Sequence, residues 1–159
     1  MGLDATIYCD CYERRELNTQ PRPEWKVYVS EDGCRETTAT DLETQLAFDR
    51  WNLEQACEHD NGCLLHHYIG NISRVGMLRK IIGEQAEKFP LILGKVIHNG
   101  VHCGDSLSLE EVKAIKPEVE ELSQIHLNSS QDECRLRNFE AQMRELVECA
   151  LLVRRPLTF

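Results

Sequence analysis

Apolar and polar side chains alternate at the start of the chain. The apolar members all fall on one side of an extended backbone: Leu3, Ala5, Ile7 and Cys9. A period of two residues predicts a β-strand over these positions. The segment WKVYV (25–29) predicts a second strand, and CRETT (34–38), which follows the Asp32-Gly33 turn, is a candidate hairpin partner for it.

The spacing then changes to that of a helix. Four residues carry the new period: Leu42, Leu46, Leu53 and Cys57. They predict a helix near 41–57, which Thr40 and Glu43 would open as a capping box. The Asn61-Gly62 pair predicts a turn because both residues tolerate positive φ. LLHHYIG (64–70) predicts a short strand directly after that turn.

A second amphipathic helix is predicted between Asn71, which can cap it, and Pro90, which cannot continue it. The apolar run LILGKVIH (91–98) follows. Because its apolar character is almost continuous, it predicts a central strand that is buried on both faces.

The last third of the chain has helical spacing. A capping box at Ser108–Glu111 predicts a helix to about Leu127, which Pro117 should kink or divide. A third capping box, Ser130–Glu133, predicts a long helix that ends before Pro156. Since strands precede helices, we expect a single α+β domain over residues 1–159, with a small mixed sheet and helices packed on one face.

The composition narrows the classes of function. The chain has 159 residues and a formal net charge of −9, and repulsion from phosphates then argues against nucleic acid as a partner. It has no apolar run long enough to span a membrane. The start, MGLDATIYCDC, lacks the features of a signal peptide. With eight cysteines and no export signal, we expect a cytoplasmic protein with reduced thiols.

Motifs for phosphate loops, zinc proteases and serine hydrolases are absent from the sequence. Their absence removes the strong signals for an enzyme without excluding one, and we expect a protein that is not an enzyme. Cysteine and histidine nevertheless gather near three turns or strand ends. The groups are Cys9 with Cys11; Cys57 and His59 with Cys63, His66 and His67; and His98 with His102 and Cys103. Thiolate and imidazole are the ligands that zinc prefers. Zinc is therefore a candidate cofactor, although no cofactor at all is the simpler expectation.

We take five residues as candidate metal ligands: Cys57, His59, Cys63, His102 and Cys103. Adjacent residues of a strand point to opposite faces, so His66 and His67 should not share one ion. Two alternatives stay open. The cysteines can be small apolar core residues, or Cys103 can be a nucleophile whose base comes from elsewhere in the fold.

Carboxylates crowd the segment after His102. They are Asp105, Glu110, Glu111, Glu118, Glu120 and Glu121. A run of this kind usually marks a solvated helix face. The sharper hypothesis is a binding face for a basic protein partner, which these charges would steer into place.

Two segments carry a resemblance to a known family. FPLILGKVIHNGVHCGDSLSLEEVKAIKPEVEEL (89–122) and GNISRVGMLRKII (70–82) resemble the core of small acidic immunity proteins of bacterial polymorphic toxin systems. The resemblance implies a non-enzymatic protein that binds and blocks a toxin domain, with the acidic residues from Asp105 to Glu121 as contacts. The sequence therefore favours an acidic interaction protein, with a structural or hydrolytic zinc protein as the alternative.

Overall fold

The computed structural model describes residues 2–98 and 105–159. It confirms the α+β class. The strands of the main sheet are β1 (Gly2–Tyr8), β4 (Cys63–Asn71), β5 (Ser106–Leu107) and β6 (Leu157–Thr158), in the order β4-β1-β6-β5. Every pairing of these strands is antiparallel, so in the described chain the sheet is antiparallel rather than mixed.

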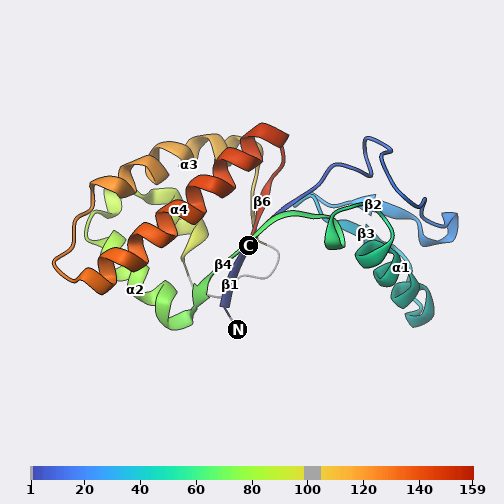
Figure 1. The fold of residues 1–159 in the computed structure, drawn as a ribbon, viewed down its shortest axis with the longest axis horizontal. Coiled ribbons are helices and arrows are strands. Elements are labelled where there is room, and N and C mark those ends of the chain that lie inside the picture. Colours follow the sequence, from blue (N-terminus) through green and yellow to red (C-terminus); the bar gives the residue numbers. More distant parts are fainter. Residues whose placement is uncertain (1, 99–104) are drawn as a thin grey trace.

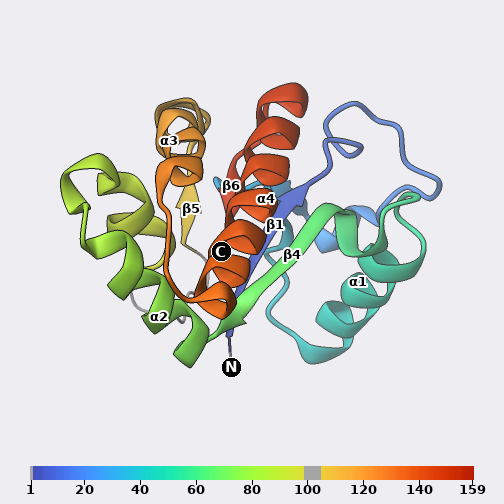
Figure 2. The same cartoon turned by 60° about the vertical axis from the view of Figure 1, so that its left-hand side comes forward.

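Three helices build the larger part of the molecule: α2 (Ile72–Gly83), α3 (Leu109–Glu121) and α4 (Ser130–Val153). They lie together on one side of the sheet, and α4 packs on the β1–β4 pair (Figures 1 and 2). An apolar stripe along α4, the long helix predicted after the third capping box, forms much of the core. Its fully buried members are Leu136, Phe139, Met143, Leu146 and Ala150.

A smaller lobe extends from the other side of the sheet (Figure 1). Residues 12–56, which we call the small lobe, contain the hairpin β2 (Val27–Val29) and β3 (Arg35–Thr37) and the helix α1 (Leu42–Glu54). The predicted hairpin is confirmed. The lobe has a hydrophobic cluster of its own, formed by Trp25, Phe48, Trp51 and Ala56. The predicted helix near 41–57 therefore packs its aromatic residues, and not its leucines, against the protein.

Short helical turns complete the secondary structure. They are η1 (Pro23–Trp25), η2 (Asp60–Gly62), η3 (Ala86–Lys88), η4 (Ile92–Val96) and η5 (Leu122–Gln124). The predicted turn at Asn61-Gly62 is confirmed, since these residues have φ values of 52° and 69°. Asn71 caps α2 and the Ser108–Glu111 capping box opens α3, as predicted.

The predicted strand at 91–98 is wrong. The chain is helical from Pro90 to Val96, with a π-helical turn at Ile92–Val96, and it bends at Ile97 and His98. Its apolar residues are buried, as the sequence requires, but periodicity alone does not distinguish a short buried strand from a short buried helix. The contact that favours the helix is made by Glu118 of α3. Its carboxylate accepts hydrogen bonds from the N–H groups of Leu91 and Ile92 at the start of the segment.

Two caps are shifted from their predicted positions. Asp41, and not Thr40, caps α1 by accepting a hydrogen bond from the N–H of Thr44 at 2.8 Å. Ser129 rather than Ser130 caps α4. α3 continues through Pro117 without division. In the described part of the chain no helix is both long enough and apolar enough to cross a membrane.

The C-terminal segment ties the sheet to the small lobe. Strand β6 lies between β1 and β5. The guanidinium of Arg155, which is 8% exposed, donates to the carbonyls of Cys9 and Gly33 at 3.3 and 3.0 Å and pairs with Glu13 at 2.6 Å. The loop after β1 is therefore fixed by a buried cation at the junction between the main sheet and the small lobe.

Candidate metal centre

Two loops meet where the chain leaves the main sheet for the small lobe and where it returns. Cys9 and Cys11 directly follow β1, and Cys57 and His59 lie between α1 and β4. The antiparallel β1–β4 pairing, which sets Tyr8 opposite Cys63, brings the two loops together. The N–H of Cys9 donates to the carbonyl of Gly62 at 2.8 Å and holds them in contact.

The ligand atoms of these four residues converge. The Sγ atoms of Cys9 and Cys57 are 3.8 Å apart, and Sγ of Cys11 is 3.5 Å from Nδ1 of His59. No two ligand atoms of the group are more than 4.8 Å apart. A tetrahedron with Zn–S bonds of about 2.3 Å and a Zn–N bond of about 2.0–2.1 Å has edges of about 3.8 Å between sulfurs and about 3.6 Å between sulfur and nitrogen. Two of the observed separations thus already have the length of tetrahedral edges, and the four residues could hold a metal ion.

The surroundings set the protonation of the thiols. Burial raises the pKa of Cys9 and raises that of Cys11 to about 12. Burial also acts to raise the pKa of Cys57, but hydrogen bonds with His59 and with Arg35, and the charge of Arg35, outweigh it and lower that pKa to about 7. The group therefore contains one thiol with a pKa near neutral and two in which burial favours the protonated form, and a metal ion that binds there would displace protons.

Arg35 is the cation beside the group. It is 5% exposed, and its Nη2 donates to Sγ of Cys57 at 3.5 Å. Its guanidinium also lies over the ring of Trp51, 5.7 Å from the centroid. Nη1 is buried without a hydrogen bond, and no carboxylate of the described residues pairs with this side chain. A buried cation without an acidic partner is costly, so the site favours negative charge on the neighbouring sulfurs.

Solvent reaches the group from one side. A hollow of about 280 Å³ is lined by Cys11, Cys57 and His59, together with Glu16, Asn18 and Glu58. Cys9 is buried, while the other three ligand residues are partly exposed. An ion can therefore reach the group from solvent without opening either hydrophobic core.

The structure brings together two of the five predicted metal ligands, Cys57 and His59. Cys63 lies in β4 and is not part of the group, and His102 and Cys103 lie outside the described residues. Their companions are Cys9 and Cys11, which stood out in the sequence as a Cys-x-Cys pair but were not assigned as ligands. The sequence did contain a signal for this site: Cys9-x-Cys11 on the first loop and Cys57-x-His59 on the second loop have the same spacing.

The adjacent histidines point to opposite faces of β4, as predicted. Nε2 of His66 lies 3.2 Å from the carboxylate of Asp4, and Nε2 of His67 lies 2.7 Å from that of Glu145 on α4. Both rings thus contact carboxylates away from the cysteine group.

The predicted acidic contacts are largely satisfied within the protein. Glu110, Glu120 and Glu121 pair with Lys113, Lys116 and Lys88 at 2.6, 4.0 and 2.7 Å respectively. Glu111 closes the capping box of α3 and pairs with Lys95, and Asp105 lies 3.9 Å from His98. Glu118 is 8% exposed, and its carboxylate accepts hydrogen bonds from backbone N–H groups. In the described chain these residues do not form an unpaired acidic face, and Glu118 is too buried to contact a partner.

Comparison with known proteins gives this site no counterpart: no protein-family model, no curated protein and no solved structure matches the chain.

Proposed function

We propose that this protein binds zinc in a structural site formed by Cys9, Cys11, Cys57 and His59. One observation carries the proposal: four soft ligand atoms from two separate loops lie within 4.8 Å of one another. Pairs of cysteine and histidine residues on two short loops are a usual source of ligands for structural zinc.

The donor set and its charge favour zinc among metal ions. Three thiolates and one neutral imidazole are soft to borderline ligands, which suit Zn²⁺ far better than Mg²⁺ or Ca²⁺. With Zn²⁺ they would carry one net negative charge. Arg35 supplies a buried positive charge in hydrogen-bond contact with one of the sulfurs. It would act as an outer partner that balances the complex.

A structural role is favoured over a hydrolytic one. Four protein ligands fill a tetrahedral shell, whereas catalytic zinc keeps one position for water or substrate. The two ligand pairs also stand at the two ends of the small lobe. A bound ion would clamp the lobe at its base, so part of its binding free energy would become folding free energy.

The test is elemental analysis of untagged protein that has been purified without chelator. We expect about one equivalent of zinc per chain in the wild type, and a loss of that zinc in the variant Cys57→Ser. Cys134→Ser is the matched control because Cys134 is exposed on α4, outside the group. Zinc below about 0.1 equivalent in the wild type, or an equal loss in both variants, would contradict the site.

A second candidate function is the binding of a basic protein segment, and the exposed face of α1 supports it. Leu42, Leu46 and Leu53 are 69%, 57% and 51% exposed. They share one side of the helix, opposite the side that packs on the small-lobe cluster. Exposed apolar residues that gather in this way mark interaction surfaces more often than isolated ones do.

Charge suggests the kind of partner for this face. Glu43, Asp49 and Glu54 of α1 are exposed, and within the described residues none of them forms an ion pair. They differ in this from the carboxylates of α3, which have partners in the protein. We infer a partner with apolar, leucine-like anchor residues surrounded by basic residues. A basic toxin domain, which is the kind of partner that the resemblance to immunity proteins implies, would have that chemistry.

The probe for this surface is a synthetic amphipathic peptide with leucine on one helical face and lysine on the other. Fluorescence anisotropy should detect binding that weakens at least about tenfold in the double variant Leu46→Gln, Leu53→Gln. Leu152→Gln is the control because Leu152 is 84% exposed on α4. Equal binding of a scrambled peptide, or equal effects of the two sets of variants, would sink this assignment.

A further inference from the structure

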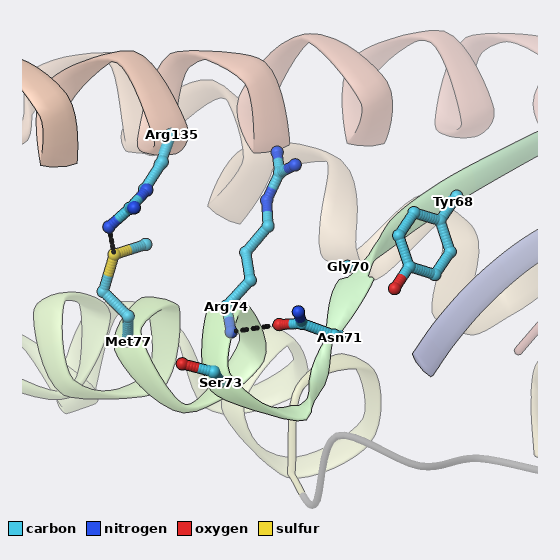
Figure 3. Close-up of a pocket in the computed structure, with 7 residues that line it drawn as sticks. All are labelled: Tyr68, Gly70, Asn71, Ser73, Arg74, Met77 and Arg135. Carbon is cyan, nitrogen blue, oxygen red and sulfur yellow. Dashed lines mark hydrogen bonds between the residues drawn. The ribbon is translucent and has the colours of Figure 1, made fainter. Parts of the chain in front are cut away.

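A second hollow, on the opposite part of the molecule from the cysteine group, has the chemistry of an anion site. It has a volume of about 370 Å³ and lies where β4 ends, α2 begins and α4 passes alongside. The side chains that matter are those of Tyr68, Asn71, Ser73, Arg74, Met77 and Arg135 (Figure 3).

The charge of this hollow differs in sign from that of the molecule. The formal net charge of the chain is −9, yet the lining contains two arginines and no carboxylate. Two guanidinium groups that line one hollow raise the local potential and attract anions, whatever the net charge at a distance.

Arg74 has no partner of its own in the described chain. Its side chain runs from α2 toward α4 (Figure 3), and no hydrogen bond or ion pair with another described residue engages its guanidinium. Its Nε atom is buried and unsatisfied. The stem lies against Gly70, where a Cβ atom would come within 2.6 Å of Cδ of Arg74. The absence of a side chain at Gly70 is therefore what lets the arginine occupy this position.

Arg135 enters from α4 and is only weakly engaged. Its Nη1 contacts Sδ of Met77 at 3.3 Å (Figure 3). The same Nη1 lies 3.4 Å from the carboxylate of Asp132. Neither is the short, paired contact that a guanidinium makes with a well-placed carboxylate. Most of its N–H donors thus remain available to a ligand.

The other polar groups of the hollow can each donate a hydrogen bond. The amide oxygen of Asn71 already accepts a hydrogen bond from the N–H of Arg74 at 2.9 Å, which leaves its NH₂ group free to donate. Within the described residues the hydroxyls of Tyr68 and Ser73 form no hydrogen bond with another residue. Donors in excess of acceptors, together with two cations, select an oxyanion.

We propose that this hollow binds the phosphate group of a small molecule, with Arg74 and Arg135 as the charged contacts. A dianionic phosphate matches two guanidinium charges and offers three oxygens to the surrounding donors. A monocarboxylate has one charge and two oxygens, and would leave donors unused. The site does not depend on the proposed zinc, because its residues and those of the cysteine group are entirely different.

The probes are inorganic phosphate and glycerol 3-phosphate, titrated by calorimetry at constant ionic strength, with acetate and chloride as reference anions. Phosphate should bind, and Arg74→Gln and Arg135→Gln should each weaken binding at least about tenfold. Arg79→Gln is the matched control because Arg79 is an exposed arginine of the same helix outside the lining. Amide NMR shifts of Ser73 and Arg74 on titration would locate the ligand.

The outcomes separate cleanly. Tighter binding of glycerol 3-phosphate than of phosphate would assign the site to an organic phosphate, and equal affinity would assign it to free phosphate. Heat no greater with phosphate than with acetate would overturn the proposal. So would phosphate binding that Arg74→Gln leaves unchanged, or that Arg79→Gln weakens equally. Circular dichroism of each variant shows whether a loss of binding is a loss of fold.

Discussion

The carboxylate of Glu118 accepts hydrogen bonds from the N–H of Leu91 at 3.0 and 3.1 Å and from that of Ile92 at 2.9 Å. In the sequence, Glu118 belongs to a run of carboxylates that usually marks a solvated helix face. In the structure, its side chain instead connects α3 to the start of the segment 91–98. Buried N–H groups at a helix start require an acceptor, and this acid supplies it from a neighbouring helix. These hydrogen bonds therefore favour a helical start for the segment that contains Ile92–Val96.

We expect Glu118→Gln to lower the free energy of unfolding by about 1–3 kcal/mol, because the amide keeps the shape but turns one acceptor into a donor that faces N–H groups. Urea denaturation measures this change. Glu120→Gln is the control, since the side chain of Glu120 is 57% exposed and lies 4.0 Å from Lys116. Equal midpoints for the two variants would show that the buried hydrogen bonds contribute nothing.

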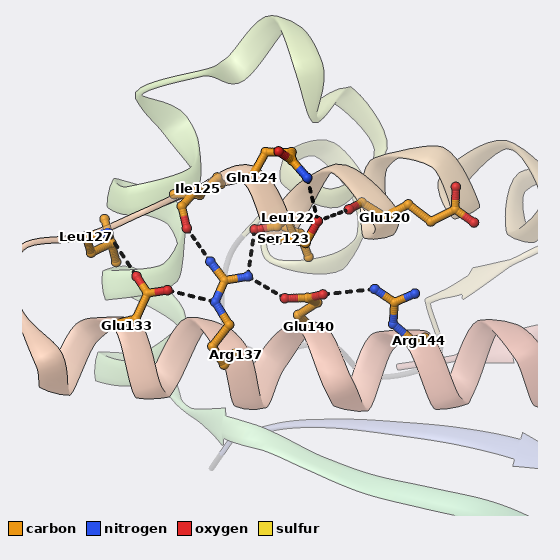
Figure 4. Close-up of polar contacts among 10 residues, drawn as sticks. All are labelled: Glu120, Leu122, Ser123, Gln124, Ile125, Leu127, Glu133, Arg137, Glu140 and Arg144. Atoms are coloured by element: carbon orange, nitrogen blue, oxygen red, sulfur yellow. Dashed lines mark hydrogen bonds and ion pairs between the residues drawn. The ribbon is translucent and has the colours of Figure 1, made fainter.

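The connection between α3 and α4 shows how tertiary contacts end an element. The helix predicted to reach about Leu127 stops at Glu121, and the chain then makes a turn. Arg137 of α4 donates to the carbonyls of Leu122 and Ile125 in that turn (Figure 4). The carbonyl of Leu122 also accepts a hydrogen bond from the N–H of Ile125 at 3.2 Å, so the guanidinium adds a second donor to Leu122 and supplies a donor to the carbonyl of Ile125. Its remaining contacts are ion pairs with Glu133 and Glu140, and Glu140 also pairs with Arg144.

At the scale of the whole molecule, the candidate metal centre lies between two hydrophobic clusters that do not merge. The larger cluster fills the space between the sheet and the helices α2 to α4, and the smaller one is confined to the small lobe. A small cluster contributes little stability by itself. The lobe therefore depends on the contacts at its base, where the cysteine group and Arg155 lie.

Removal of zinc should accordingly destabilise the small lobe more than the rest of the protein. Both tryptophans of the chain, Trp25 and Trp51, belong to the small-lobe cluster, so their fluorescence reports on that lobe alone. Circular dichroism reports mainly on α2 to α4. We expect chelation to lower the stability measured by fluorescence by at least about 3 kcal/mol, with a smaller effect on the circular dichroism transition.

The matched variant for this experiment is Cys57→Ser, which should unfold identically with and without chelator. Two transitions that coincide before and after chelation in the wild type would contradict a clamp at the base of the lobe. That outcome would leave zinc content itself to be judged by elemental analysis.

The sequence by itself determined the features that depend on residues close together in the chain. The α+β order, the hairpin in the small lobe, the turn at Asn61-Gly62 and the cap at Asn71 follow from side-chain periodicity and turn chemistry. It also singled out Cys57 and His59. Only the tertiary structure joined them to Cys9 and Cys11, because that depends on the pairing of β1 with β4 across the whole small lobe. The same holds for Glu118 and residues 91–98, where a contact distant in sequence chose between two structures that the local pattern allows equally.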